Sequence, residues 1–582
     1  MKYYDRMLLL ENKYGLRRSK YLRNLRMYYY SPTISLENIE DSQQVGYYNQ
    51  GFFDIEDDTT SSVQENIIRS CIDTLTSKIA SQKVRPFFNT VGGTFKDMQI
   101  AKASQEYFDY LYDEKNVNKV ISEAFRDACI FDTGVIFIDN LNKVDIERVY
   151  PWQVFTDQRE AAYGDLTQIA YKRRQYPASL LPYKSNKQSV TYWSYWNIKE
   201  HVRVDYFVED NKYFKYEYTP NELPFIFLHY DTPVKGNGAM SVVDQLYGIQ
   251  LAIDAIMTKI KDASQLSSPL KYMVPENSDI KVTKLSNRVG EIITYSPIPG
   301  QTTPPVMSVT EPFMDPQWIE TIAQLKNDAY ELVGITQMSA TGQKPKGLDS
   351  GVALSTMEDI EDNRFEVQLN NIIRCYVDLA KKCIAIFDPK SNVLPETKTR
   401  SNIKWKDVVR ANANLKIQFS AAESLSKDPS IKLQQLQSLA AAGLIPQGRI
   451  AQLMELPDLQ TGYSFSNNAE NAVMTVIDDC VTKDVFEVPD YVPFDMLKVE
   501  ITNTVLSLKA ANRPENNNDI NKLLQLYSMV DAKMQEDELS AETDMANTQA
   551  ATMEQLASQI QSGQCDEQTL AQAQALLGNI QN

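Results

Sequence analysis

Two glycines five residues apart, Gly342 and Gly347, lie in the stretch GITQMSATGQKPKGLDSGVALSTM (residues 334–357) and match the glycine spacing of a phosphate-binding loop. Such a loop also needs a lysine that reaches the phosphates and then a serine or threonine that holds magnesium, directly after the second glycine. This chain has Leu348 and Asp349 there, and an aspartate repels phosphate. The preceding WIETIAQLKNDAYELV indicates a helix, whereas a nucleotide loop follows a strand. We therefore predict a flexible loop between two helices rather than a nucleotide site.

Histidine and cysteine, the usual residues of metal centres and nucleophilic sites, are few and scattered. His201 and His229 each stand alone, so the sequence offers few of the residues that a zinc site or a serine–histidine triad needs. No two cysteines form a CxxC pair, and we expect free thiols in a reducing compartment. The six are Cys71, Cys129, Cys375, Cys383, Cys480 and Cys565. We predict no catalytic residue, no cofactor, no metal ligand and no enzymatic activity.

The composition limits the classes of partner. At 582 residues with 43% hydrophobic residues, the chain can hold several domains and bury a core. Its net charge of −17 argues against a surface that grips nucleic acid, because tight phosphate binding is carried by Lys and Arg. Brief contact with nucleic acid remains compatible with this charge. The sequence has no run of about 18 apolar residues and no apolar signal core, so we expect a soluble protein without a membrane partner.

The N-terminal 30 residues carry eight Lys or Arg against two acids, interleaved with tyrosines. Two interpretations remain open: a basic arm that touches nucleic acid or an acidic partner, and a helix with a solvated basic face. The following acidic stretch, SPTISLENIEDSQQVGYYNQGFFDIEDDTTSS, is rich in turn residues. It predicts a linker.

From Val63 apolar residues recur every three or four positions, which predicts a helix that Pro86 ends. A second helix through EAFRDACIFD leads into a short strand, GVIFIDN. Residues 146–230 alternate and are rich in Tyr, Val and Trp, so they predict antiparallel strands. Together these patterns predict a mixed α and β domain.

Two further helices bracket an insertion. The first has an apolar stripe at Val242, Leu246, Ile249, Ile253, Ile256 and Ile260. The second is expected to begin with Asp315 as N-cap and Pro316 in the first turn, and to stop at Gly334. Its stripe is predicted at Ile319, Ile322, Leu325, Ala329 and Leu332. The insertion between them predicts a small strand-bearing module; the stripes are explained either by a core within one subunit or by contacts between subunits.

The second half of the chain is predicted to be mainly helical. A periodic pattern without proline or internal glycine runs from Gly351 to Phe387, which as a helix would be about 55 Å long. A helical hairpin, broken at Gly443 and Pro446, is expected after it. The last 52 residues hold nine acids and one Lys and predict two helices separated near Gly563. Isolated helices of this kind are marginal, so we infer assembly with further copies.

The order of these parts resembles the portal proteins of tailed bacteriophages. The matching pieces are ENIIRSCIDTLTSKIASQKVRPF, FRDACIFDTGVIFID with VYPWQVFTD, GNGAMSVVDQLYGIQLAIDAIMTK, AYELVGITQMSATG, SGVALSTMEDIEDNRF, and AESLSKDPS with LAAAGLIP. Their order over about residues 60–460 carries the resemblance, and the extreme termini match nothing specific. In that family, usually twelve copies form a ring around a DNA channel at one capsid vertex.

The resemblance implies an α+β fold with a mixed wing, paired stem helices, a small strand-bearing clip, a long wing helix and a C-terminal helical crown. The expected segments are 1–60 (basic, Tyr-rich arm and linker), 61–240 (wing), 241–265 (stem helix), 266–313 (clip), 314–334 (stem helix), 335–350 (tunnel loop), 351–500 (wing, with the long helix) and 501–582 (crown).

The resemblance also implies two functional surfaces. The tunnel loop would project into the DNA channel with Gln337, Ser339, Thr341, Gln343, Lys344 and Lys346, of which the two lysines touch passing phosphates. The clip would meet the large terminase during packaging and a head-to-tail adaptor afterwards, through Lys271, Lys281, Lys284 and Arg288. Sparse lysines in an acidic ring suit DNA that slides better than DNA that is bound.

The function implied is that of a non-enzymatic virion portal, present in the host cytoplasm during assembly and then at the capsid vertex. Its partners would be itself, the major capsid protein, the large terminase, the adaptor and tail proteins, and the double-stranded DNA that is packaged and later ejected. Two alternatives stay open. One is another structural protein of a phage tail or baseplate, and the other is an ATP-dependent DNA translocase.

Overall fold

The computed structural model is of the α+β class, and it divides into two compact units. Unit 1 comprises Met1–Phe87, Ala103–Ala411 and Ile417–Glu423, and unit 2 comprises Phe88–Lys102, Asn412–Lys416 and Ser424–Asn582. The structure describes residues 2–31, 34–40, 65–80, 85–90, 95–139, 144–164, 166–233, 236, 238–267, 271–273, 307–309, 316–336, 339, 364–387, 405, 415–419, 437–438, 440–441, 469, 472–510, 514 and 516–561.

Two antiparallel sheets form the centre of unit 1. In the first, β2 (Thr133–Asp139) pairs with β3 (Asp145–Val149) on one side and with β9 (Phe225–His229) on the other. The second places five strands in chain order: β4 (Val154–Thr156), β5 (Gln168–Pro177), β6 (Ser189–Asn197), β7 (Val202–Phe207) and β8 (Lys212–Glu217). A shared core of Phe137, Tyr171, Trp196 and Phe225 joins the sheets. The predicted antiparallel strands over residues 146–230 are confirmed.

The N-terminal residues belong to unit 1 as packed helices, α1 (Lys2–Asn12) and α2 (Gly15–Tyr29). Met7, Leu10 and Tyr14 are buried against the five-stranded sheet, beside Phe155 and Trp193. Several of the basic side chains pair with carboxylates elsewhere in unit 1: Arg6 with Glu200, Lys13 with Asp157, and Arg17 with Asp132. The helical interpretation is therefore correct, but much of the basic face is paired with carboxylates.

The stretch predicted to be a linker contains a helix, α3 (Leu36–Glu40), so that part of the prediction is wrong. Leu36 is buried, and Trp152 Nε1 donates a 2.6 Å hydrogen bond to Glu40. These contacts with residues distant in the sequence stabilise a turn of helix that local composition disfavours. Residues 41–64 of the predicted linker lie outside the described part of the chain.

Helix α4 (Ile67–Ile79) ends seven residues before the predicted stop at Pro86, which instead begins β1 (Pro86–Thr90). Asn66 caps its N-terminus by accepting from the Arg69 amide. Strand β1 pairs with β12 (Leu415–Phe419). Next in the chain comes α5 (Phe95–Glu114).

Helix α6 (Val117–Phe131) packs directly on β2, as the sequence predicted for this helix–strand pair. The chain turns between them at Asp132, whose φ of 93° is unusual for a residue with a side chain. A Cβ on Gly134 would lie 1.9 Å from the Ala124 carbonyl oxygen. Only glycine therefore allows the close approach of this helix to this strand.

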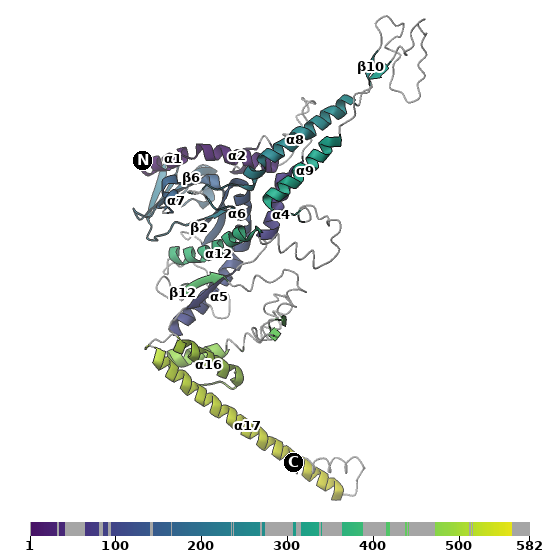
Figure 1. The fold of residues 1–582 in the computed structure, drawn as a ribbon. Coiled ribbons are helices and arrows are strands. Elements are labelled where there is room, and N and C mark those ends of the chain that lie inside the picture. Colours follow the sequence, from purple (N-terminus) through teal and green to yellow (C-terminus); the bar gives the residue numbers. More distant parts are fainter. Residues whose placement is uncertain are drawn as a thin grey trace, which may run out of the picture. The chain divides into compact units, whose positions relative to one another are not determined.

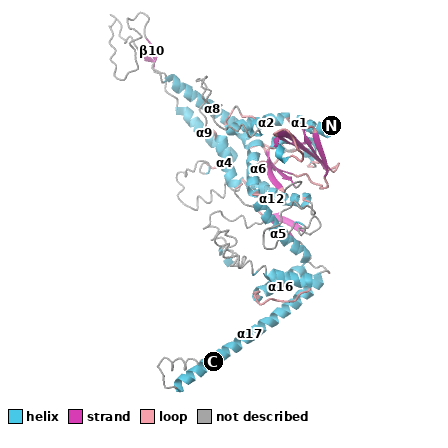
Figure 2. Cartoon of the chain, turned by 180° about the vertical axis from the view of Figure 1, so that it is seen from behind, coloured by secondary structure: helices cyan, strands magenta, loops and turns pink. Residues whose placement is uncertain are grey.

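Helices α8 (Val242–Ser267) and α9 (Pro316–Val333) run side by side as an antiparallel pair, with the short strands β10 (Lys271–Met273) and β11 (Met307–Val309) beyond their shared end (Figures 1 and 2). β10 and β11 are antiparallel partners. The predicted helices and a strand-bearing connection are confirmed for the described residues. Ser241 and Asp244 cap α8 reciprocally, since each accepts from the other's backbone amide.

The predicted stripe on α9 is partly wrong. Ile322 and Ala329 are buried as expected, but Ile319 and Leu332 are 54% and 51% exposed. The core-facing residues after Ala329 are Tyr330 and Val333. The prediction placed the next residue of the buried stripe three positions after Ala329, at Leu332. In the structure it lies four positions after Ala329, at Val333, so Leu332 points away from the core. On α8, Val242, Leu246 and Ile253 are buried, whereas Ile256 and Ile260 are half-buried.

The described part of the predicted long helix is α12 (Glu366–Ile386), which begins after a turn at Phe365. Residues 351–363 lie outside the described ranges. α12 packs on β9 and α6, and Lys382 Nζ donates to the backbone carbonyls of Leu223 and Phe225 at 2.9 and 2.7 Å. The remaining described elements of unit 1 are α7 (Gln158–Tyr163) and the 3-10 turns η1 (Pro151–Gln153) and η2 (Ala178–Leu180).

Unit 2 is built around α16 (Phe494–Ala510) and α17 (Asn516–Gln561), with helical residues 472–483 beside them. Their core includes Ile477, Leu497, Ile501, Leu523 and Leu526. The 46-residue α17 ends near the predicted break at Gly563, but it begins at Asn516, before the last 52 residues in which the helix was predicted. The boundary expected at residue 500 falls inside α16. The predicted hairpin near Gly443 and the segment after Gln561 lie almost wholly outside the described residues.

No helix among the described residues is long and apolar enough to cross a lipid bilayer.

Candidate functional site

The described residues on either side of the segment after α9 lie close together. α9 stops at Gly334, whose φ is 88° and whose amide donates to the Tyr330 carbonyl at 2.8 Å. Arg364, at the far end of the segment, donates from Nη2 to the Glu331 carbonyl at 3.1 Å. A Cβ on Gly334 would lie 3.1 Å from Arg364 Nε. Arg364 thus caps the C-terminus of α9 and brings the chain just before α12 next to it.

Of the predicted tunnel-loop residues, only Ser339 is described. Its hydroxyl accepts a 3.1 Å hydrogen bond from Thr336 Oγ1. The other five lie outside the described residues: Gln337, Thr341, Gln343, Lys344 and Lys346. The predicted start of the loop after Gly334 agrees with the end of α9, whereas its predicted end at residue 350 lies outside the described residues.

Of the four predicted clip residues, Lys271 lies in β10, where its backbone is in register with Val309 of β11. The others fall in the part of the insertion that the structure does not describe: Lys281, Lys284 and Arg288. The pairing of β10 with β11 brings the two ends of the insertion together at the tip of the α8–α9 pair.

The base of the α8–α9 pair is held by residues that precede and begin α4. Gln250 on α8 donates to the Glu65 carbonyl at 2.7 Å and accepts from the Ile67 amide at 3.0 Å. Lys326 on α9 forms an ion pair with the Glu65 carboxylate. Glu65 therefore contacts both helices and fixes how far one is shifted along its axis relative to the other.

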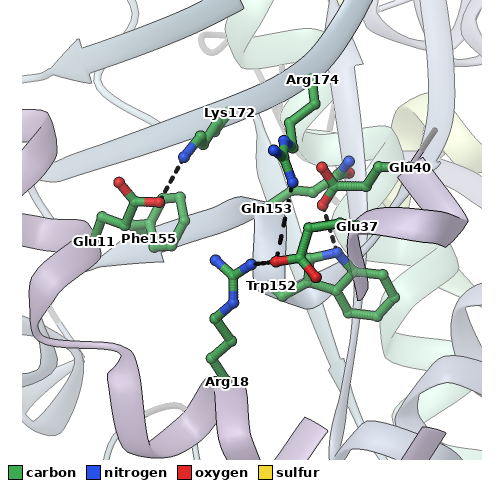
Figure 3. A pocket seen from close by; sticks show the side chains of 9 residues that line it. All are labelled: Glu11, Arg18, Glu37, Glu40, Trp152, Gln153, Phe155, Lys172 and Arg174. Atoms are coloured by element: carbon green, nitrogen blue, oxygen red, sulfur yellow. Dashed lines mark hydrogen bonds and ion pairs between the residues drawn. The ribbon is translucent and has the colours of Figure 1, made fainter. Parts of the chain in front are cut away.

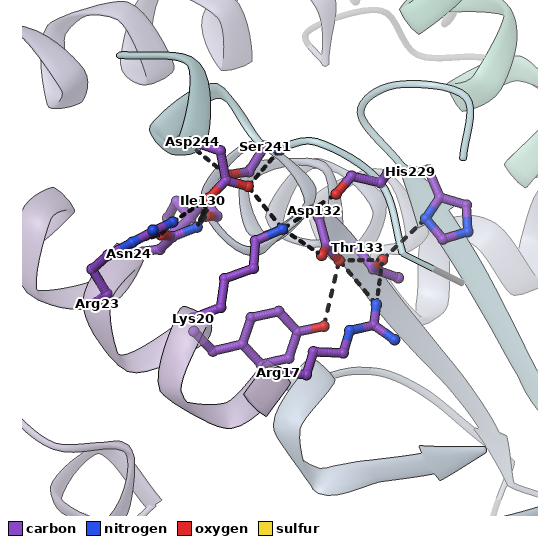
Figure 4. A network of polar contacts seen from close by, with 12 residues as sticks. Arg17, Lys20, Arg23, Asn24, Ile130, Asp132, Thr133, His229, Ser241 and Asp244 are labelled. Carbon is purple, nitrogen blue, oxygen red and sulfur yellow. Dashed lines mark hydrogen bonds and ion pairs between the residues drawn. The ribbon is translucent and has the colours of Figure 1, made fainter. Parts of the chain in front are cut away.

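A polar network ties α2 to the start of α8 (Figure 4). Lys20 Nζ lies 3.1 Å from Asp132 Oδ2 and 2.8 Å from Asp244 Oδ2. Burial alone raises the pKa of Asp244, but the hydrogen bonds from Lys20 and from Ser241 outweigh it and lower that pKa. Asn24 adds bonds to the Ile130 carbonyl and to Ser241 Oγ at 2.9 and 3.0 Å. The network fixes where α8 leaves the sheet-containing part of unit 1.

A cavity of about 260 Å³ lies between α1–α3 and strands β4 and β5 (Figure 3). Its three cations pair with glutamates of the same cavity: Lys172 with Glu11 at 2.6 Å, and both Arg18 and Arg174 with Glu37. Burial raises the pKa of Glu40, which accepts from Trp152. These charges neutralise one another. We therefore interpret the cavity as the place where α3 packs on unit 1, and not as a reactive site.

His229 is half-buried, and the cysteines of the described residues are buried. Burial lowers the pKa of His229, whose Nδ1 bonds to Thr133 Oγ1 at 3.0 Å. The five cysteines in the described part of the chain are buried as free thiols, and burial raises the pKa of each one. Among the described residues, no group of three His, Cys, Asp or Glu side chains is placed to hold a metal ion.

The sequence alone did not identify Arg364, Glu65 or the network around Lys20. The spacing of Ser241 and Asp244 was a readable capping-box signal for the start of α8. The partners of Lys20 are more than 100 residues away, and no local pattern reports such a contact.

No protein-family model matches the chain, and no curated protein sequence matches it.

Proposed function

We propose that this chain is a portal protein, a ring at one capsid vertex through which double-stranded DNA is packaged and ejected. The observation that carries the proposal is the α8–α9 pair. Two long adjacent helices leave a mixed α and β body and end at a small paired-strand tip, and the end of the second helix is hydrogen-bonded to Arg364 just before α12. A stem, a clip and a tunnel loop require these connections in this order.

The solvent-facing apolar side chains of the pair support assembly. Leu251 on α8 is 45% exposed, and Ile319 and Leu332 on α9 are 54% and 51% exposed. One copy leaves these three side chains uncovered on elongated helices, where a neighbouring copy would bury them. The proposed ring gives them a partner.

The proposed role of the loop is a weak, sequence-independent contact with passing DNA, made by Lys344 and Lys346. The tip at β10 and β11 is the proposed docking surface for the large terminase and then for the adaptor and tail proteins. The wing would face the major capsid protein. In this proposal the protein acts without catalysis, in the host cytoplasm during assembly and afterwards in the virion.

The test is the assembly state of the full chain. Purified protein at micromolar concentration in moderate salt should give rings with a central hole in averaged electron micrographs. Native mass spectrometry should give one closed stoichiometry, with twelve copies expected. A strictly monomeric species under these conditions would contradict the proposal.

A further inference from the structure

We propose that neighbouring copies meet head to tail along the stem, with one face of α8 packed against the Ile319–Glu320 edge of α9 in the next copy. The α8 face, called here the outer face, consists of Gly248, Leu251, Ala255 and Lys259. This inference rests on the proposed ring and names the residues through which its copies associate.

The outer face is a single exposed stripe, and the exposed Asp262 continues it one turn nearer the tip. Its members are spaced by three, four and four residues, so they lie within about one quarter of the helix circumference. All four are exposed, and Leu251 retains 45% of its surface. The buried residues Val242, Leu246, Gln250 and Ile253 lie on the opposite side of the helix. α8 is therefore packed on one side and uncovered on the other.

Gly248 is the second observation. It lies inside a 26-residue helix, and no heavy atom lies within 4 Å of the position where its Cβ would be. Glycine inside a helix is destabilising relative to alanine. No described residue of this copy requires a glycine at position 248, whereas a second helix that approaches the α8 backbone closely would require one.

The alignment of α8 with α9 shows which residues of α9 lie at the level of Lys259. Glu65 contacts both Gln250 and Lys326, so these two residues stand at the same height on the antiparallel helices. Nine residues further along α8, Lys259 is level with the first turn of α9, where Ile319 and Glu320 are exposed.

The charged residues that α9 exposes are all acidic among its described side chains: Glu320, Asp328 and Glu331. Lys259 of one copy would therefore face Glu320 of the next, with Ile319 beside it. Leu251 would lie about two turns further from the tip.

A contact between two different surfaces repeats from copy to copy and closes into a ring when the rotation allows. A symmetric contact, with two outer faces against each other, would stop at a dimer and would not use Glu320. The head-to-tail contact therefore needs both Lys259 and Glu320, whereas the symmetric contact does not need Glu320. Charge changes at these two residues distinguish the two arrangements.

The first experiment measures assembly by sedimentation velocity for Lys259→Glu, Glu320→Lys and the double variant, with Lys215→Glu on β8 as the matched control. Each single variant should raise the half-assembly concentration at least tenfold, because like charges then meet. The double variant should recover most of the loss, and the control should assemble like the wild type.

The second experiment separates packing from folding at Gly248. Gly248→Leu should preserve helix content and the thermal unfolding temperature, because leucine is a good helix former, yet it should block assembly. Leu251→Ala should weaken assembly, whereas Leu180→Ala, at a residue 59% exposed elsewhere in unit 1, should not.

A third measurement reports the geometry directly. In a Cys565→Ser background, Lys259→Cys combined with Glu320→Cys should give an oxidised ladder of products beyond the dimer on denaturing gels. Each single cysteine variant should give no ladder.

The outcomes separate the two proposals. A wild type that forms rings, with charge and glycine variants that assemble equally well, overturns the head-to-tail contact and leaves the portal function standing. Products that stop at the dimer overturn it in favour of the symmetric contact. A wild type that never assembles overturns both.

Discussion

Arg364 Nη2 donates a hydrogen bond to the backbone carbonyl of Glu331 at 3.1 Å. The two residues stand at opposite ends of a long connection, one just before α12 and the other in the last turn of α9. A cation at the C-terminus of a helix satisfies an orphan carbonyl and is favoured by the helix dipole. This single side chain therefore joins the start of α12 to the C-terminal end of α9.

Removing the clamp should loosen the loop without preventing folding. Arg364→Met keeps the aliphatic stem but loses the donor, and we expect a loss of about 1 kcal/mol in the free energy of unfolding. Trypsin cleavage after Lys346 should become several-fold faster, measured by mass spectrometry of timed digests. Arg374→Met, at an exposed position on α12, is the matched control and should cleave at the wild-type rate. Equal rates for Arg364→Met and the wild type would show that the clamp is dispensable.

The half-buried His229 makes stability depend on pH. Thr133 donates its one hydroxyl proton to Asp132 Oδ1 at 2.6 Å, so its oxygen accepts from His229 Nδ1–H. Burial lowers the pKa of His229 below its usual value of about 6.5, and the nearby Asp132 opposes this only in part. A lowered folded-state pKa means that this stabilisation is present above about pH 6.5 and is lost as pH falls through the folded-state pKa.

Urea unfolding at pH 7.5 and at pH 5.5 measures this effect. The wild type should lose up to about 1 kcal/mol between the two pH values from this group, since one pKa unit corresponds to about 1.4 kcal/mol. His229→Gln should be less stable at pH 7.5 but should show a flatter pH dependence. His201→Asn, at the exposed second histidine, should leave the pH dependence unchanged. An unchanged slope in His229→Gln would refute the assignment.

Replacing the tip, residues 266–313, by a short glycine–serine link should leave unit 1 folded. β10 and β11 pair only with each other in the described sheets, so their loss leaves the two central sheets intact. Binding of the large terminase and of the adaptor should fall below detection in pull-down and surface plasmon resonance assays. A near-wild-type circular dichroism spectrum is the folding control. Retained binding of either partner would count against the tip as its docking surface.

Changing both Lys344 and Lys346 to alanine should leave ring assembly unaltered, because the two charged side chains contribute little apolar area. Each lysine removed should lower the salt dependence of DNA association by about one unit at most. The DNA content of assembled particles should change, measured by nucleic-acid absorbance after particle purification. The loop should bind no ATP, since Leu348 and Asp349 replace the groups that hold phosphate and metal. ATP binding that disappears in the double variant would revive the phosphate-loop hypothesis.

Helix positions could be predicted from the sequence wherever periodicity and end signals agreed. Pro316 and Gly334 bound α9 within one residue of the prediction, and the regular stripe from Val242 gave α8. Which residues face the core was harder to predict. Leu332 and Val333 are adjacent apolar residues, and only the packing of α9 decides which one is buried.

Contacts between distant segments account for the errors. α3 forms because Leu36 finds a core and Glu40 finds Trp152, neither of which local composition reports. Pro86 was expected to end a helix, yet it occupies the first position of a strand, where a missing N–H is tolerated. The candidate site shows the same contrast between local and distant signals. Gly334 predicted where α9 stops, whereas the role of Arg364 became visible only from its contact with α9.

The close approach of α6 to β2 also restricts how this sequence can diverge. Any descendant that keeps the helix on the strand must keep glycine at position 134, because even a methyl group would meet the Ala124 carbonyl. Position 132 is constrained differently. Its backbone conformation would accept glycine, but such a change would remove the carboxylate that Arg17 pairs with and one of the two that Lys20 pairs with. Remote relatives are therefore expected to share the spaced pair Asp132 and Gly134, with the cations of α2, after overall sequence identity has been lost.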